Sequence, residues 1–345
     1  MNLLITGAAG FIGVNFVRYW LAAHPDDHLT ILDALTYAGN RASVPEDAPN
    51  VRLVVGDICD EALLAAIIDG GDIETIVHFA AESHVDRSIT GPGAFLRTNV
   101  QGTYTLLEVV RKNDLRFHHI STDEVFGSLG PEDPAFTEET SYQPNSPYSA
   151  SKAASDHFVR AYFHTYGLRV TTSNCSNNYG PYHFPEKLIP LCITNALRGL
   201  SLPIYGDGLN IRDWLYVEDH CYGIDLVLQR GRLGETYNIG GCNEWKNIDL
   251  VKLLCDLIDE AFSNNHAWAL QYPNAPAAQG KKTDSLITYV TDRAGHDRRY
   301  SVDTTKSRTE LGYAPRNTFP EGIRKTVEWF LANESWWKPL LPKAK

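Results

Sequence analysis

The sequence has no excess of positive charge. Its 31 Lys and Arg residues stand against 42 Asp and Glu residues, which gives a formal net charge of −11. Phosphate backbones and lipid headgroups attract positively charged surfaces, so this balance argues against general nucleic-acid binding and against anionic-membrane binding. It leaves room for a local pocket that binds an anion.

Short cysteine spacings and long apolar runs are also missing. None of the six cysteines belongs to a C-x-x-C pair, so reduced, mostly buried thiols are expected rather than a disulfide framework, and no metal. His118 and His119 lie inside a predicted strand, where core packing is the expected role. The segment MNLLITGAAG has no basic region and glycine soon interrupts its apolar run, which argues against a signal peptide or a membrane span. A cytoplasmic enzyme is the expectation.

The first half of the 345-residue chain alternates short β-branched runs with segments of helical periodicity. The predicted strands are 3–6, 29–32, 51–55, 75–79, 117–121 and 169–173, and residues 13–23 and 61–69 have helical spacing. Alternation of this kind predicts an α/β fold, a Rossmann-type doubly wound parallel sheet with helices on both faces.

The alternation weakens from about residue 177, where prolines become frequent. We therefore predict a Rossmann domain over 1–176, to which segments at about 213–241 return. Strand patterns at 214–217 and 235–239 are expected to join the main sheet. Residues 177–212 and 242–345 are predicted to form a smaller mixed α/β domain.

The sequence predicts a dinucleotide site where the first strand ends. Gly7, Gly10 and Gly13 form a G-x-x-G-x-x-G pattern between this strand and the following helix. Glycines here let the backbone turn tightly and let a phosphate approach the helix N-terminus. Asp33 lies twenty residues beyond Gly13 at the end of the second strand, where a carboxylate binds a ribose 2′-hydroxyl and repels a 2′-phosphate. The pattern favours NAD over NADP, although glycines in plain turns look similar.

Further cofactor contacts are predicted at the same edge of the sheet, because open α/β sheets bind ligands at the carboxyl ends of their strands. They are Phe11 and Ile12 at the helix start, Ala34, Leu35 and Thr36 after the second strand, Asp57 and Ile58 after the third, and Ala80, Ala81, Glu82 and Ser83 after the fourth.

Tyr148 and Lys152 lie four residues apart in a helical pattern, and so share one helix face. A nearby ammonium favours the phenolate of a tyrosine, whose ordinary pKa is about 10. The pair is therefore suited to remove a proton from a sugar hydroxyl. Exposed pairs with this spacing are common by chance, and it is the neighbouring nucleotide site that favours catalysis.

The glycine pattern, Asp33, Tyr148, Lys152 and the length resemble the extended short-chain dehydrogenase/reductase superfamily over nearly the whole chain. The resemblance implies that Lys152 also holds the nicotinamide ribose and that Tyr148 takes the substrate hydroxyl proton as hydride leaves the carbon. It also implies a homodimer joined by a helix at 95–113 and by the helix that carries Tyr148.

Two adjacent carboxyl groups, Asp123 and Glu124, follow Thr122 at the end of the fifth strand. Their place at the ligand edge of the sheet suits acid and base catalysis, although consecutive acids also cap loops. A simple sugar epimerase oxidises and re-reduces one carbon and needs no such pair. A dehydratase does need it, because one group removes the C5 proton and another protonates the departing C6 hydroxyl.

The triplet Thr122, Asp123 and Glu124 closely resembles that of the dTDP-glucose 4,6-dehydratase family. This resemblance implies an NAD-dependent lyase that oxidises C4 of dTDP-glucose, eliminates water across C5 and C6, and returns hydride to C6 to give dTDP-4-keto-6-deoxyglucose. It implies that Asp123 is the acid, that Glu124 is the base, and that Thr122 hydrogen-bonds the hexose.

The same resemblance extends into the smaller domain, which is expected to bind the nucleotide sugar. Thr98 and Asn178 match cofactor contacts, and Arg212 matches the residue that binds the diphosphate. The other expected substrate contacts are His84, Asn177, Lys187, Leu188, Pro203, Ile204, Tyr205, Asn247, Asp292, Arg293 and His296. Ala294 stands where the family usually has proline, which leaves the geometry of that loop open.

Two other interpretations remain open at this stage. One is a 4-epimerase, or a dehydratase that acts on a UDP or GDP sugar, which shares every feature except the acid triplet and the base-reading loops. The other is a catalytically silent NAD-binding regulator. Intact Tyr148, Lys152, Asp123 and Glu124 argue against the regulator.

Overall fold

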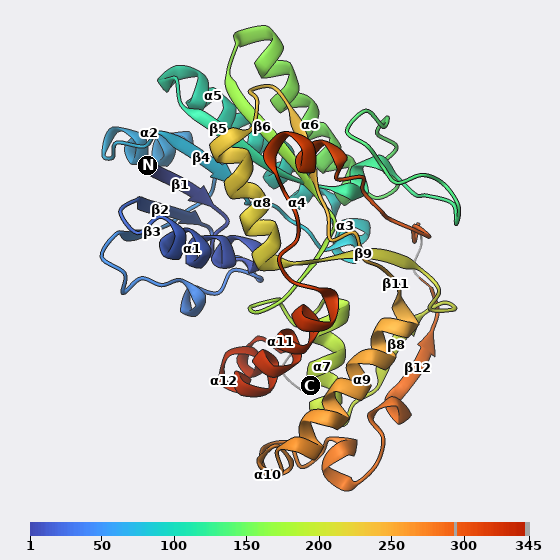
Figure 1. Cartoon of the computed structure of the whole chain (residues 1–345). Coiled ribbons are helices and arrows are strands. Elements are labelled where there is room, and N and C mark those ends of the chain that lie inside the picture. The colour runs from blue at the N-terminus through green and yellow to red at the C-terminus, as the bar shows by residue number, and fades with distance from the viewer. Residues whose placement is uncertain (293–294, 342–345) are drawn as a thin grey trace.

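The computed structural model describes residues 1–292 and 295–341. Its main sheet has seven parallel strands in the order β10-β6-β5-β4-β1-β2-β3 (Figure 1). These strands are β1 (Asn2–Thr6), β2 (His28–Asp33), β3 (Val51–Val55), β4 (Thr75–His78), β5 (Arg116–Thr122), β6 (Arg169–Cys175) and β10 (Thr236–Ile239). The predicted doubly wound parallel sheet is confirmed, with strand bounds close to those expected from the sequence.

Helices cover both faces of the sheet because successive strand residues point to opposite sides. Leu3 and Ile5 pack against α1 and α8, whereas Leu4 packs into the core beneath α2, α5 and α6. The bounds are α1 (Phe11–Ala23) and α8 (Val217–Arg230) on one face, and α2 (Glu61–Asp69), α5 (Thr103–Asn113) and α6 (Pro147–Tyr166) on the other. The two apolar layers fix the strand ends that carry the predicted site.

The helix predicted at 95–113 is present but not uniform. A π-helical segment, Leu96–Gly102 (η2), precedes α5, and the short helices α3 (Val85–Thr90) and α4 (Pro92–Phe95) lead into it. The π turn packs against α6.

The second half of the chain builds a smaller α/β unit beside the main sheet (Figure 1). It has two small sheets, ordered β11-β9-β7 and β12-β8. Its elements are β7 (Asn177–Tyr179), α7 (Leu188–Arg198), β8 (Leu202–Tyr205), β9 (Ile211–Tyr216), β11 (Glu244–Lys246), α9 (Asn247–Asn264), α10 (Ala267–Gln271), β12 (Ile287–Val290), α11 (Phe319–Ala332) and α12 (Glu334–Trp337). Ile193, Trp214, Leu254 and Trp337 lie in its apolar core.

One strand expected in the main sheet lies elsewhere. The pattern at 214–217 forms the end of β9, which pairs with β7 and antiparallel β11. The position beside β6 is taken by β10, as expected for the pattern at 235–239. Only α8 and β10 thus return to the main sheet, since a strand pattern does not itself specify which edge it pairs with. The division at residue 176 stays a prediction.

Candidate active site

The three glycines make a turn between β1 and α1 that approaches the end of β4. Gly7 has a φ of 72°, and a Cβ on it would lie 2.5 Å from the Cα of Ala80. A Cβ on Gly13 would lie 2.6 Å from the carbonyl oxygen of Gly7. The turn therefore requires glycine at both places. No side chain caps the start of α1 after Gly10, so its first N–H groups, which include those of Phe11 and Ile12, suit a phosphate.

Asp33 ties this turn to the loop after β2. Its Oδ2 accepts a hydrogen bond from the N–H of Ala9 at 2.8 Å, and its Oδ1 accepts one from the N–H of Leu35 at 2.8 Å. Burial raises the pKa of the Asp33 carboxyl, and these two N–H groups oppose the rise. Each carboxylate oxygen has a second lone pair, so a ribose hydroxyl can still bind there.

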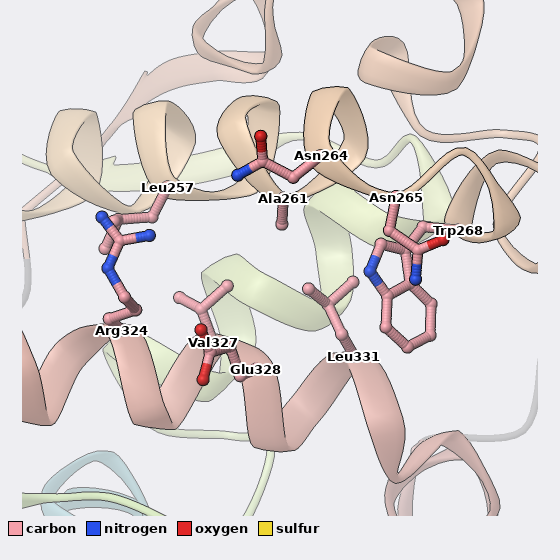
Figure 2. A pocket seen from close by; sticks show the side chains of 9 residues that line it. All are labelled: Leu257, Ala261, Asn264, Asn265, Trp268, Arg324, Val327, Glu328 and Leu331. Carbon is pink, nitrogen blue, oxygen red and sulfur yellow. The ribbon is translucent and has the colours of Figure 1, made fainter.

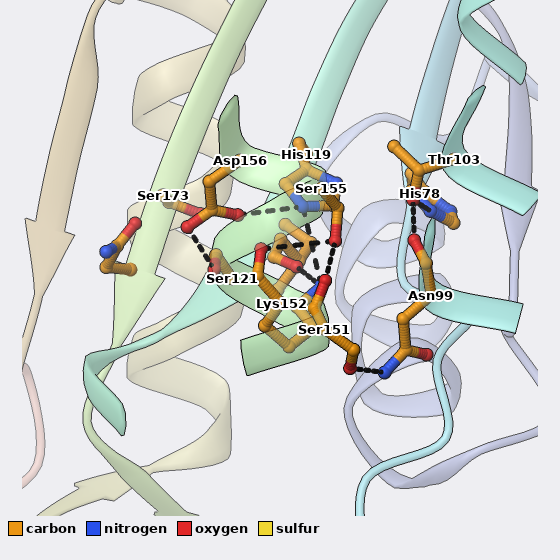
Figure 3. Close-up of polar contacts among 12 residues, drawn as sticks. His78, Asn99, Thr103, His119, Ser121, Ser151, Lys152, Ser155, Asp156 and Ser173 are labelled. Atoms are coloured by element: carbon orange, nitrogen blue, oxygen red, sulfur yellow. Dashed lines mark hydrogen bonds and ion pairs between the residues drawn. The ribbon is translucent and has the colours of Figure 1, made fainter. Parts of the chain in front are cut away.

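Asn99 was not predicted from the sequence, yet it fixes the segment after β4. It accepts a hydrogen bond from the N–H of Glu82 at 2.8 Å and donates to the Glu82 carbonyl at 3.0 Å. Its Nδ2 also donates to the hydroxyl of Ser151 on α6 at 2.8 Å (Figure 3). The neighbouring Thr98, a predicted cofactor contact, is half-buried beside this junction. The signal in the sequence is weak, because the partners lie far apart along the chain.

The acid triplet stands at the end of β5, where Asp123 begins a short 3-10 turn. Asp123 is 1% exposed, its Oδ1 accepts a 3.3 Å hydrogen bond from the Thr122 hydroxyl, and its Oδ2 has no hydrogen-bond partner among the described residues. Burial, then the charges of Glu124 and Asp213, raise the pKa of Asp123 well above its ordinary value, against the opposing charge of Arg212. Asp123 therefore keeps its proton to a higher pH than an ordinary aspartate does.

Tyr148 faces the same triplet from the first turn of α6. Burial, and then the charge of Glu124, raise its pKa well above the ordinary value, while a hydrogen bond with Thr122 opposes the rise. The net direction is therefore opposite to the lowering expected from the Tyr148 and Lys152 spacing, because burial makes the largest contribution. The Lys152 ammonium donates to the carbonyl oxygen of Ile120 at 2.7 Å. Lys152 is 4% exposed, and its role in the site stays a prediction.

Arg212 belongs to β9 of the smaller unit and lies close enough to Asp123 for its charge to lower the pKa of that carboxyl. Its Nη2 donates to the carbonyl oxygen of Asp297 at 3.0 Å, and its guanidinium stacks over the ring of Tyr300 at 4.3 Å. Tyr300 was not predicted from the sequence. Burial makes the largest contribution to its raised pKa and the charge of Glu124 the second largest, which indicates that Tyr300 lies near Glu124. These residues therefore face one another across the two parts of the fold.

Two predicted asparagines have buried amide oxygens, Asn177 in β7 and Asn247 at the start of α9. The Oδ1 atoms of Asn177 and Asn247 are buried and have no hydrogen-bond partner among the described residues. Buried polar atoms are ordinarily paired, so such oxygens suit a ligand that supplies the donor. Asn178 instead uses its Oδ1 to contact Nδ1 of His220 at 2.9 Å.

Glu186 and Lys187, in the segment between β7 and α7, contact the loop after β4. Lys187 donates from Nζ to the carbonyl oxygen of Ser83 at 2.8 Å. Nε2 of His84 lies 3.6 Å from a carboxylate oxygen of Glu186, and burial lowers the pKa of His84. The structure therefore brings the predicted cofactor and substrate residues together here.

Three of the remaining predicted substrate residues, Tyr205, His296 and Asp292, form a second group at the end of β8. Tyr205 is 40% exposed and its ring meets that of His296 edge-on, and His296 contacts Asp292 at 2.6 Å. Ile204 is 1% exposed and packs in the core of the smaller unit, so its role as a substrate contact stays a prediction. Pro203 precedes it in β8, Leu188 packs on the core of the smaller unit, and Arg293 lies outside the described residues.

Other features of the described chain lie away from this edge. A pocket of about 170 Å³ opens between α9, α10 and α11, lined by side chains that include Leu257, Trp268 and Arg324 (Figure 2). No group of three or more His, Cys, Asp or Glu side chains among the described residues is placed to hold a metal ion. None of the helices in that part of the chain is long and apolar enough to cross a membrane.

Comparison with known proteins places this geometry among sugar-nucleotide enzymes. Residues 4–326 match a family model described as GDP-mannose 4,6-dehydratase. The dTDP-glucose 4,6-dehydratase of Xanthomonas campestris is 54% identical, over 96% of this chain and 94% of that one. The dTDP-glucose 4,6-dehydratase of Streptomyces venezuelae, solved with NAD bound, is 49% identical with a TM-score of 0.89, over 99% of this chain and 100% of that one. A UDP-glucose 4-epimerase of Thermotoga maritima shares the fold with a TM-score of 0.83 at 27% identity, over 96% and 98%.

Proposed function

This chain, which matches the GDP-mannose 4,6-dehydratase family model, belongs to the dTDP-glucose 4,6-dehydratases, and we propose from its site that it is an NAD-dependent hydro-lyase. It converts dTDP-glucose to dTDP-4-keto-6-deoxyglucose and water. The observation that carries the proposal is the buried carboxyl of Asp123 next to Glu124 at the end of β5, facing Tyr148 on α6.

The rival epimerase shares the fold but has less support. An epimerase needs a group that exchanges the proton of one hydroxyl, which Tyr148 alone supplies. A water elimination also needs a proton donor for the leaving hydroxyl and a base for the neighbouring carbon, and the adjacent carboxyls of Asp123 and Glu124 supply both. The identity of 54% to a dehydratase against 27% to the epimerase points the same way.

The residues at the end of β1 and β2 fit NAD. The cradle that a Cβ on Gly7 or Gly13 would fill, the uncapped start of α1 and the carboxylate of Asp33 suit a pyrophosphate and a ribose without a 2′-phosphate. When bound, NAD supplies a hydride acceptor whose positive charge favours a nearby phenolate. Lys152, Tyr148, Asn178 and Thr98 line the rest of the proposed site.

We assign the proton transfers to three side chains. Tyr148 takes the proton of the C4 hydroxyl, which Thr122 helps to orient. Glu124 then removes the C5 proton, made acidic by the new ketone, and Asp123 gives its proton to the departing C6 hydroxyl. When C6 accepts the hydride back, Glu124 returns the proton to C5, which gives the saturated keto sugar. The raised pKa of Asp123 supports its role, because an acid must still hold its proton near neutral pH.

The smaller unit is proposed to hold the nucleotide diphosphate. Arg212 carries a planar charge that suits a diphosphate, and it lies near Asp123, as the opposing effect of its charge on the pKa of Asp123 indicates. The oxygens of Asn177 and Asn247 are proposed to accept hydrogen bonds from the bound sugar nucleotide. We propose that Tyr205 and His296, whose rings meet edge-on, pack against the base.

A homodimer through α5 and α6 is a further part of the proposal. Leu96, Tyr104, Phe158 and Tyr166 are all exposed on or next to these helices, and the rings of Tyr104 and Phe158 contact each other. Apolar side chains gathered on one helical surface are typical of a subunit interface. Sedimentation of the wild type and of a Leu96→Glu variant tests it, and an unchanged dimer in the variant contradicts it.

We also propose that the enzyme acts in the cytoplasm. All six cysteines are free, and four of them are buried. Unpaired thiols are usual in a reducing compartment. Cell fractionation with an antibody to the native protein tests this location.

The experiment that tests the function compares dTDP-, UDP- and GDP-hexoses with saturating NAD. We expect dTDP-glucose to give the keto sugar with no net reduced cofactor, identified by mass spectrometry of the product. Faster turnover of a UDP or GDP sugar would reassign the substrate. NAD binding without turnover of any nucleotide sugar would favour a silent regulator.

A further inference from the structure

A buried chain of polar groups extends from Lys152 to the residue before the acid triplet (Figure 3). Nζ of Lys152 lies 3.4 Å from Nε2 of His119, and that nitrogen lies 3.1 Å from Oδ1 of Asp156. The other oxygen of Asp156 accepts hydrogen bonds from the hydroxyls of Ser121 at 2.8 Å and Tyr142 at 3.0 Å. Lys152, His119 and Asp156 are each almost fully buried.

His119 acts as a neutral spacer in this chain. The same ring nitrogen is nearest to both the ammonium of Lys152 and the carboxylate of Asp156, and it can serve only one of them as acceptor or donor. Burial, and then the charge of Lys152, hold the pKa of His119 well below its ordinary value. The ring therefore adds no second positive charge beside Lys152.

Asp156 supplies the negative charge that a buried ammonium needs. Burial lowers the pKa of Lys152, and the charge of Asp156 opposes that fall. The other titratable groups around the pair are His78 from β4, His119 from β5, Cys175 from β6, and Tyr142 and His157. Asp123 and Glu124 act on Tyr148, one helical turn before Lys152. The neutral side chains in this set cannot balance the charge of Lys152.

We propose that Asp156 is a positioning residue whose buried carboxylate, acting across His119, keeps Lys152 protonated and oriented for the nicotinamide ribose and for Tyr148. Through the hydroxyl of Ser121 it also fixes the end of β5, directly before Thr122. This inference rests on the proposed role of Lys152 in cofactor binding. It adds a residue that neither the Tyr148-x-x-x-Lys152 pattern nor the acid triplet contains.

The variant Asp156→Asn removes the charge and keeps the shape. Its amide oxygen can still accept from Ser121 and Tyr142. The carboxylate of Asp156 acts on Lys152 across the His119 ring nitrogen. In the effective dielectric of a protein interior, a charge at such a distance changes the ionisation constant of the ammonium by about ten- to a hundredfold. We expect the pKa of Lys152 to fall in the variant, so NAD affinity and kcat/KM should decline at a lower pH than in the wild type.

The acidic side gives a second expected result. The pKa of Asp156 is raised to about 6, first by burial, so below that pH the wild-type carboxyl becomes neutral too. The wild type and Asp156→Asn should then converge. A residue needed only for packing would lower the values by a similar factor at every pH.

Asp225 on α8 offers a matched control on the opposite face of the sheet. Its carboxylate accepts a hydrogen bond from the hydroxyl of Tyr19 at 2.9 Å and lies 3.1 Å from Nε2 of His24. It thus has the same kinds of partner as Asp156. The variant Asp225→Asn should leave the pH dependence unchanged.

The test is a calorimetric titration of the full-length protein with NAD across a pH series, with kcat/KM for dTDP-glucose measured in parallel. A basic limb that moves to lower pH in Asp156→Asn, stays in place in Asp225→Asn and returns in Asp156→Glu supports the proposal. Equal limbs in Asp156→Asn and the wild type overturn it. If Asp156→Asn does not fold, Asp156→Ser serves as the neutral variant. Because NAD binding needs no turnover, failure of the proposed substrate leaves this test intact.

Discussion

Replacing Asp123 by asparagine should separate activity from stability. The side chain is 1% exposed and its Oδ2 has no hydrogen-bond partner among the described residues. Asparagine has nearly the same shape as the protonated acid but has no acidic proton to give. The variant should therefore fold normally and fail as the proposed proton donor.

The loss of rate follows from the usual contribution of a general acid. Such a group accelerates a step by about a hundred- to ten-thousandfold, or about 3 to 5 kcal/mol of barrier. We expect kcat of Asp123→Asn to fall within this range. C4 oxidation should still occur, because Tyr148 is intact, so reduced cofactor should build up in the first turnover.

Stability should change in the opposite sense. The folded pKa of Asp123 is raised, so between the unfolded and folded pKa values the folded wild type holds a proton that the unfolded chain has released. The wild type therefore loses stability as pH rises through this window, by about 1.4 kcal/mol for each pH unit. Asparagine does not ionise, so the variant should gain in relative free energy of unfolding over the same window.

Urea unfolding of both proteins at a series of pH values measures this difference, and stopped-flow absorbance follows the cofactor. Tyr272 lies in the core of the smaller unit, where its hydroxyl donates to the carbonyl oxygen of Leu331, so Tyr272→Phe checks that loss of one buried polar group does not by itself give the pattern. The reasoning fails if Asp123→Asn loses stability across the window, or if its kcat stays within a few fold of wild type.

Three further predictions concern the same edge of the sheet. Glu124→Gln should slow C5 proton removal by about a hundred- to ten-thousandfold, and reduced cofactor should be visible by absorbance. Because the charge of Glu124 raises the pKa of Tyr148, the acidic limb of the pH profile for C4 oxidation should also move to lower pH in this variant. An unmoved limb contradicts the coupling between Glu124 and Tyr148. Tyr148→Phe should slow C4 oxidation itself, so single-turnover absorbance should show no build-up of reduced cofactor, and a build-up equal to that of Glu124→Gln would refute the assignment. Gly7→Ala should lower the free energy of unfolding by about 1 to 3 kcal/mol more than Gly167→Ala does. The two glycines have a similar φ, but a Cβ on Gly7 would lie 2.5 Å from Ala80 whereas a Cβ on Gly167 would meet open space. Calorimetric melting measures both variants, and equal losses would show that crowding is not the cause.

The features predicted well from the sequence are those whose partners are close in the chain or fixed by the sheet. Gly7, Gly13 and Asp33 follow directly from strand, turn and helix order, and parallel strands bring their carboxyl ends to one edge. Asp123 and Glu124 could be placed for the same reason. The sequence predicted a lowered pKa for Tyr148, whereas the structure gives a raised one. This rise could not be predicted, because the burial of Tyr148 and the position of the Lys152 ammonium depend on the packed fold.

The missed residues are those whose roles arise only from long-range packing. Asn99 joins the loop after β4 to α6 across 52 positions of the chain, and Asp156 reaches Ser121 across 35. His119 was expected to pack in the core, which it does, but a strand pattern says nothing of the lysine beside it. The prediction that residues 214–217 join the main sheet was wrong for the same reason, because the partner of β9 is decided by long-range packing.

Adjacent acid and base at one strand end cannot be treated as independent groups. The charge of Glu124 raises the pKa of both Asp123 and Tyr148, so neutralising it eases ionisation of the acid and of the proposed phenolate together. When Glu124 accepts the C5 proton it loses that charge, which makes the Asp123 proton easier to release toward the departing hydroxyl. Base action and acid action are thus linked through one charge, and the losses in Asp123→Asn and Glu124→Gln should not add in the double variant.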